Sequence, residues 1–182
     1  MKKIFILACI FFVGCASHDP YPLDWPYIDL KEKCTKVDGI YENIGLISKT
    51  DNSIALSSLF FPDSNNIHTD EEKHIIFKTN KDGTINIKIK GERNNIIATQ
   101  KIRPNDYRCV NGWNVIQSSS GHSKDIFIYF ERKNISFTKT DGDLLIREKA
   151  SVKGVAFIVF PVMNNSTKWY WFKKINKAKV ND

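Results

Sequence analysis

The 182-residue sequence lacks the short motifs that commonly mark an active site. Its nine glycines form no Gly-rich phosphate loop, which disfavours nucleotide binding. No Gly-x-Ser-x-Gly elbow is present, and the four cysteines show neither the spacing of a zinc site nor a Cys-x-x-Cys redox pair. The apolar run from Ile4 to Val13 has only ten residues, too few to span a bilayer. These absences favour a protein that is not an enzyme and uses no cofactor.

Two segments nevertheless hold residue types that serve in catalysis or metal binding. Ser118 to His122 places serines beside a histidine without an identifiable aspartate to orient it, and we interpret the segment as a polar hairpin loop. His68 and His74 are six residues apart, which does not match one helix face, and acidic residues and a lysine lie between them. We interpret that segment as a solvated loop. The sequence therefore predicts no catalytic residues and no metal ligands.

The N-terminus has the parts of a bacterial export signal. Met1 to Lys3 form a short positive region, the apolar run follows, and Gly14 and Cys15 precede a polar stretch that begins at Ser17. A short apolar run between a positive start and a small-residue cleavage site is typical of a signal peptide. We predict that residues 1–14 are removed from the mature chain.

The tetrad Phe12-Val13-Gly14-Cys15 resembles the lipobox of bacterial lipoproteins, with Phe12 where that family usually has leucine. The resemblance implies that Cys15 receives diacylglycerol on its sulfur and an acyl chain such as palmitate on the freed amine. Several acyl chains together hold a protein stably on a membrane. Ala16 resembles the sorting signal for the outer membrane, which implies a lipid-anchored domain that faces the periplasm. The alternative is an ordinary secretory signal, with Cys15 kept as a thiol.

The positive charge of the chain is modest and scattered. Removing Lys2 and Lys3 from the 27 basic residues leaves 25 against 20 acidic ones, about +5. No dense basic run accompanies a nucleic-acid motif, so nucleic acid is not an expected partner. Several lysines near the C-terminus form either a solvated tail or a polybasic segment that contacts anionic lipid head groups. They are Lys168, Lys173, Lys174, Lys177 and Lys179.

The cysteine count agrees with export. Cys9 leaves with the signal peptide and Cys15 is the lipid site, so Cys34 and Cys109 remain. In an oxidising compartment such a pair most simply forms one disulfide, and this one would close a loop of about 75 residues, worth about 4 kcal/mol. Two buried free thiols are the alternative.

Residues 15–29 form a predicted membrane tether, followed by a single β-domain over residues 30–182. Pro20, Pro22 and Pro26 favour an extended course for the tether, and Trp25 is expected to dock onto the domain. Asp51 to Ser53 place capping residues before an apolar stripe from Ile54 to Phe61 that ends at a proline, which predicts a short helix, with a strand as the alternative.

The rest of the domain has strand patterns. Residues 84–90 alternate strictly, and turn signals at Asp82-Gly83, Asn111-Gly112 and Asp141-Gly142 separate such segments. Fully apolar stretches predict central strands at residues 126–130 and 155–162. The fold class is therefore all-β, an antiparallel meander closed as a lipocalin-like barrel or folded as a sandwich, with the helix available to plug an open end.

Two family resemblances follow from these residues. Short motifs across most of the mature chain resemble a family of proteobacterial lipoproteins without an assigned activity, so no catalytic residues are implied. The motifs are Val37 to Gly45, Leu56 to Phe61, Asp24 to Pro26, Asp141 to Leu144 and Trp169 to Phe172. Gly39-Ile40-Tyr41 resembles the Gly-x-Trp strand that opens lipocalins, with tyrosine in place of tryptophan.

These observations favour a non-catalytic module that serves envelope structure or binds an envelope protein. A carrier of a small apolar ligand is the first alternative, with Tyr41, Trp113, Trp169 and Trp171 as the expected pocket. An inhibitor of a periplasmic hydrolase is the second, and it would insert an exposed loop from Ser118 to Lys124 into its target.

Overall fold

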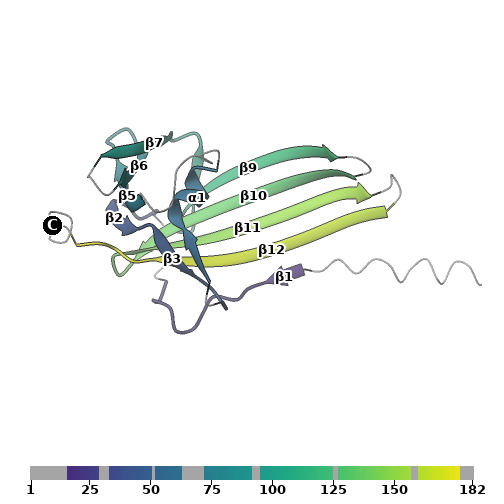
Figure 1. The fold of residues 1–182 in the computed structure, drawn as a ribbon, viewed down its shortest axis with the longest axis horizontal. Coiled ribbons are helices and arrows are strands. Elements are labelled where there is room, and N and C mark those ends of the chain that lie inside the picture. Colours follow the sequence, from purple (N-terminus) through teal and green to yellow (C-terminus); the bar gives the residue numbers. More distant parts are fainter. Residues whose placement is uncertain are drawn as a thin grey trace, which may run out of the picture.

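The computed structural model describes residues 16–28, 33–50, 52–62, 72–91, 95–124, 127–156 and 160–176. These residues form strands and one short helix (Figure 1). The elements are β1 (Ala16–His18), β2 (Gly39–Glu42), β3 (Ile44–Ile47), β4 (Ser53–Ala55), α1 (Leu56–Phe60), β5 (Glu72–Thr79), β6 (Ile85–Gly91), β7 (Ile96–Ile102), β8 (Tyr107–Val110), β9 (Trp113–Lys124), β10 (Phe127–Thr140), β11 (Asp143–Ala156) and β12 (Phe160–Phe172).

The strands form two sheets. The larger has the order β4-β3-β12-β11-β10-β9-β8, and the smaller has the order β2-β5-β6-β7. Every pairing within these orders is antiparallel, and β1 adds to β12 in parallel. Neither sheet closes on itself among the described strands, so the all-β prediction is confirmed in its sandwich form and no lipocalin-like closure is found.

The core lies between the two sheets. Alternate residues of β6 are buried, as the sequence pattern predicts, and Phe77 from β5 packs edge-on against Phe60 of α1 at 5.3 Å between ring centroids. The same Phe60 ring lies 5.6 Å from Phe137 of the larger sheet. The helix therefore joins the two layers, because its aromatic residue contacts both of them.

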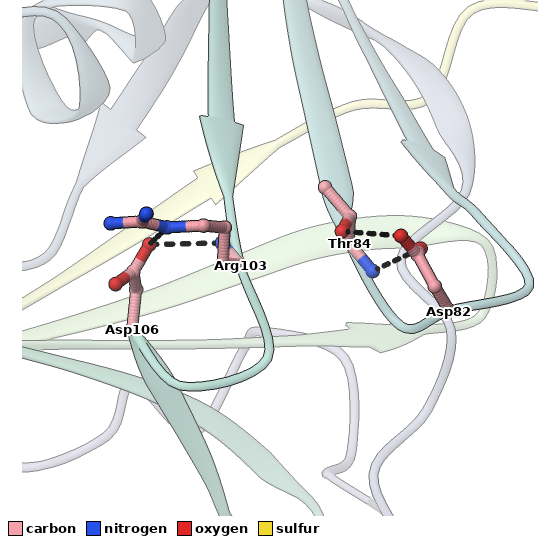
Figure 2. Close-up of polar contacts among 4 residues, drawn as sticks. All are labelled: Asp82, Thr84, Arg103 and Asp106. Atoms are coloured by element: carbon pink, nitrogen blue, oxygen red, sulfur yellow. Dashed lines mark hydrogen bonds and ion pairs between the residues drawn. The ribbon is translucent and has the colours of Figure 1, made fainter.

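The predicted hairpin turns are confirmed. Asn111 and Gly112, and likewise Asp141 and Gly142, have positive φ angles, which two-residue hairpin turns require. In the turn between β5 and β6, Asp82 accepts hydrogen bonds from the backbone N–H and the hydroxyl of Thr84 at 2.9 and 3.0 Å (Figure 2).

The helix is confirmed but starts later than predicted, since Ile54 belongs to β4 and only Leu56–Phe60 are helical. Ala55 is the N-cap and provides no side-chain hydrogen bond, so neither Asn52 nor Ser53 is the N-cap, and Asp51 lies outside the described residues. Within the described part of the chain, no helix has the length and apolar character needed to cross a membrane.

Three strand predictions are wrong in detail. The stretch 155–162 is not one strand, because β11 ends at Ala156 and the chain reverses before β12 begins at Phe160. Ser118 to Lys124 is not a loop, because it pairs in register with β10 as part of β9. The stretch 126–130 is not buried on both sides: Ile128 and Phe130 are 49% and 67% exposed, while Ile126 lies outside the described residues.

Ile128 and Phe130 lie in the part of the larger sheet that extends beyond the end of the smaller sheet. Strands β9, β10, β11 and β12 run on together past the smaller sheet and the helix (Figure 1). We call this extension the arm, and its end beyond β9–β10 and β11–β12 the tip. The arm consists of residues 117–124 of β9, 127–134 of β10, 149–156 of β11 and 160–166 of β12. Its strands continue because each has a partner, although no second layer of described residues covers them.

Candidate functional site

The N-terminal segment docks on the outer face of the larger sheet, the face turned away from the smaller sheet. The Tyr21 ring lies 5.0 Å from Trp169, and the Trp25 ring lies 5.8 Å from Trp171. The prediction that Trp25 docks is thus confirmed. Together with residues of β9, β11 and β12 these rings form a second apolar cluster, distinct from the core. It contains Tyr21, Trp25, Ile28, Trp113, Val115, Leu145, Trp169 and Trp171.

Polar contacts fix the segment along its length. The indole Nε1 of Trp169 donates a hydrogen bond to the carbonyl oxygen of Asp19 at 2.8 Å, and the Thr140 hydroxyl donates to the carbonyl of Tyr27 at 2.6 Å. Lys49 forms an ion pair with the Asp19 carboxylate at 3.2 Å. These contacts lie at both ends of the segment, so residues 19–28 follow the sheet instead of standing free of the domain.

Arg147 of β11 packs against two rings at the edge of this aromatic cluster. Its guanidinium lies 5.0 Å from the ring centroid of Trp113 and 5.4 Å from that of Trp169, within the range of cation–π attraction. Burial lowers the pKa of Arg147, because the surrounding rings displace water from the charged group. The side chain stays charged near neutral pH, because an arginine is not deprotonated in proteins.

The predicted pocket residues do not share one pocket. Tyr41 is fully buried in the core between the sheets, where its hydroxyl donates to the carbonyl of Val37 at 3.0 Å. Trp113, Trp169 and Trp171 lie in the outer cluster, across the larger sheet from Tyr41. The reason is the alternation of β12: Tyr170 and Phe172 face the core, so their neighbours Trp169 and Trp171 face outward.

Of the four cysteines, two are bonded and two lie outside the described residues. Cys34 and Cys109 form a disulfide with their Cα atoms 5.6 Å apart, as predicted. The bond ties the segment before β2 to β8. The alternative of two free thiols is therefore wrong. Cys15 is outside the described residues, as is Cys9.

The described residues of the two segments with candidate catalytic or metal-binding side chains lie on strands. Ser118, Ser119 and Ser120 are exposed on β9, and the side chain of His122 is not described. His74 is buried on β5, so this part of the predicted solvated loop is a strand, whereas His68 is outside the described residues. No group of three or more possible metal ligands is found among the residues that the structure describes.

Two carboxylates have lowered pKa values for local reasons. Hydrogen bonds from Thr84 lower the pKa of Asp82, and hydrogen bonds from Arg103 lower that of Asp106. Both carboxylates are exposed, and each accepts from a residue two or three positions away. These contacts stabilise turns.

The outer face of the arm carries the features that the sequence analysis missed. Ile128, Phe130 and Met163 are exposed near its tip, and a hollow of about 210 Å³ lies behind them. Arg132, Asn134, Lys149, Ala150, Ser151, Asn165, Ser166 and Thr167 line this hollow. The sequence of β10 does contain an indication of this surface. Ile128, Phe130 and Arg132 follow one another at a spacing of two, so they share one face of the strand, and a charged residue on that face indicates that it is exposed.

Fold and site together define an all-β sandwich with a docked N-terminal segment and an uncovered arm. Comparison with protein-family models, with curated proteins and with solved structures finds no match to this chain. Its function is therefore argued from its own geometry.

Proposed function

We propose that the chain is a bacterial outer-membrane lipoprotein, held by acyl chains on Cys15, whose β-sandwich faces the periplasm and serves envelope structure or binds an envelope protein. One observation carries this proposal. Ala16, the residue after Cys15, pairs with Asn165 at the start of β1, so the chain joins the sheet directly after the proposed anchor. No flexible linker separates the two.

The docked segment supports the same function. From Asp19 to Ile28 the chain runs over the outer cluster and is held by the Trp169 and Thr140 hydrogen bonds. A chain that only needed to be tethered would not require these contacts. A chain that holds a domain in one orientation on a membrane does require them, and a fixed orientation suits a structural or partner-binding module.

The two alternatives from the sequence have no comparable support. A carrier that used Tyr41 together with Trp113 would need one cavity that reaches both, and they lie in separate clusters. An inhibitor that inserted Ser118 to Lys124 would need a loop there, and the segment is part of β9.

The test is the intact mass of the protein purified from its own cell envelope. The expected polypeptide begins at Cys15, carries the mass of its acyl chains and has lost two hydrogens to the disulfide. A Cys15→Ser variant should lose the acyl mass and leave the membrane fraction on washing, whereas a Cys34→Ser/Cys109→Ser variant should keep it. A mature wild-type chain without acyl chains would overturn the proposal.

A further inference from the structure

The outer face of the arm is apolar at its tip and basic nearer the body. Phe130 of β10 lies opposite Lys153 of β11, which lies opposite Met163 of β12, so these residues form one row across three strands. Directly opposed residues of antiparallel strands share a face. Ile128 and Val155 form the next row toward the tip. The end of the arm therefore carries an apolar patch with one lysine in it.

This patch differs from scattered surface hydrophobics. Single exposed apolar side chains are normal, but neighbouring ones on one face mark an interaction site. Phe130 is 67% exposed and Met163 is 54% exposed. Across the strand pair, Phe130 lies against Gly121, where an added Cβ would approach the ring to 3.2 Å. Gly121 thus leaves room for a large ring that the domain itself does not bury.

A basic belt lies behind the patch. Arg132 is two residues from Phe130 on β10, so it lies on the same face about 7 Å nearer the body. Arg132 and Lys149 line the hollow of about 210 Å³, together with hydroxyl and amide side chains such as Ser151 and Asn165. Positive charge beside uncharged hydrogen-bond donors is a chemistry that suits phosphate oxygens.

The charge balance of the arm is positive. Arg132, Lys149 and Lys153 are on the outer face, while Lys133 on the opposite face forms an ion pair with Glu148 at 3.0 Å. Glu131 is also on that opposite face. The outer face of the arm therefore has basic residues and no acidic one among its described positions on β10 and β11.

The chain enters the domain from the direction of this patch. β1 runs parallel to β12 with Ala16 opposite Asn165, so the end of β1 that leads back to Cys15 points toward Met163 and the tip (Figure 1). Met163 is two residues beyond Asn165, a distance of about 7 Å along the strand. Cys15, the proposed lipid anchor, directly precedes Ala16 and is therefore attached at this end.

We infer that the tip of the arm inserts into the interface of an anionic bilayer beside the attachment point of the N-terminus. Ile128, Phe130 and Met163 enter the acyl boundary, and Arg132 and Lys149 bind lipid phosphates at the hollow. The separation of about 7 Å between patch and belt matches the 5–10 Å to which interfacial apolar faces are buried. The inference rests on the proposed function for the anchor, but the surface itself acts without acyl chains.

Vesicle flotation of an unacylated protein tests this surface directly. The protein is the mature chain with Cys15→Ser, exported behind a cleavable secretory signal, so that only its surface can bind lipid. We expect it to float with vesicles of phosphatidylethanolamine and phosphatidylglycerol and to bind phosphatidylcholine vesicles much less. Raising the salt concentration should weaken the binding, because exposed charges are screened.

Matched variants identify the residues responsible. Phe130→Ser/Met163→Ser and Arg132→Gln/Lys149→Gln should each weaken vesicle binding by about tenfold or more, the effect of losing one buried apolar side chain or a few head-group contacts. Ile96→Ser/Leu46→Ser removes two equally exposed apolar residues from the body and should bind as the parent does. Circular dichroism checks that each variant is folded.

A fluorophore measures insertion independently of affinity. With Cys34 and Cys109 bonded and Cys15 replaced, Met163→Cys provides the only free thiol for an environment-sensitive label. Its emission should shift to the blue and be quenched by lipids that carry quenchers in their acyl chains. A label at Lys101→Cys, on exposed β7 of the smaller sheet, should show neither change.

The outcomes separate this inference from the proposed function. The inference is overturned if the arm substitutions leave vesicle binding unchanged, or if the protein does not bind vesicles at all, even when native Cys15 is acylated. Arm-dependent self-association in sedimentation, without vesicle binding, also overturns it and shows that a second copy covers the patch. Arm-dependent vesicle binding together with an unacylated native protein keeps the inference and removes the proposed anchor.

Discussion

Asn43 caps helix α1 from a distance of 14 residues in the sequence. Its side-chain oxygen accepts a hydrogen bond from the backbone N–H of Ser57 at 2.9 Å. Its carbonyl oxygen accepts another from the N–H of Leu56 at 2.6 Å. Asn43 itself is buried between β2 and β3. The helix start is thus fixed to the sheet, although its own N-cap residue, Ala55, provides no side-chain acceptor.

Replacing this cap should destabilise the fold. Asn43→Ala removes the acceptor for Ser57, and the expected loss in free energy of unfolding is about 1 kcal/mol, the usual cost of losing a helix cap. Urea unfolding followed by circular dichroism measures it. Asn105→Ala, at an exposed turn position, is the control and should change little. Equal stability of the two variants would show that Asn43 is not an effective cap.

The disulfide should account for a large part of the stability. The Cys34→Ser/Cys109→Ser variant is expected to lose about 4 kcal/mol, because the bond closes a 75-residue separation and restricts the unfolded chain. Unfolding in denaturant with and without reductant measures this loss. The wild type should respond to reductant and the double variant should not. A wild type that is equally stable after complete reduction would contradict the prediction.

Arg147 should stabilise the outer aromatic cluster. Arg147→Ala removes the cation from Trp113 and Trp169 along with the packed stem of the side chain, and we expect a loss of about 1–2 kcal/mol. The free energy of unfolding of Arg147→Lys should lie between those of the wild type and Arg147→Ala. Tryptophan fluorescence during urea unfolding is the measurement. Arg108→Ala, on exposed β8, is the matched control, and an effect as small as that of the control would disprove the role.

Docking of the N-terminal segment should weaken at high pH. Burial, with a smaller contribution from the charge of Asp24, raises the pKa of Tyr21 to about 12. The folded state therefore holds the phenolic proton more tightly than the unfolded state does. The resulting stabilisation is complete below pH 10 and is lost as the pH rises toward 12.

Tyr21→Phe isolates this effect because it keeps the ring against Trp169 and removes the ionisable group. Its unfolding free energy should decline less steeply above pH 10 than that of the wild type. Burial also raises the pKa values of Tyr41 and Tyr170, so both proteins should still lose some stability there. Identical alkaline slopes for the two proteins would contradict the assignment to Tyr21.

Local patterns in the sequence were sufficient for the strands whose neighbours are close along the chain. Ile85, Ile87 and Ile89 alternate with polar residues, and Asn111-Gly112 favours a two-residue turn by its own backbone preferences. The pairing of Cys34 with Cys109 followed from the count of cysteines. Each of these predictions depends only on residue types and their spacing along the chain, and none requires knowledge of tertiary contacts.

Other features depend on contacts that no local pattern records. The cap by Asn43 requires knowledge of which strand passes the helix. Phe130 is apolar like a core residue, but it lies on the outer face beyond the residues that the docked N-terminal segment contacts, so it is exposed. The aromatic run from Trp169 to Phe172 shows no preferred face until the docked segment covers one side and the core the other.

The continuous length of β10 has a consequence for the membrane arrangement that we propose. Its 14 residues span about 45 Å from the tip of the arm to the Asp141-Gly142 turn. With the tip in the bilayer and the N-terminal segment held against the same sheet, that turn stands at a set height above the membrane. In this proposed arrangement, a partner that binds at the far end would meet the protein only at one fixed distance from the membrane.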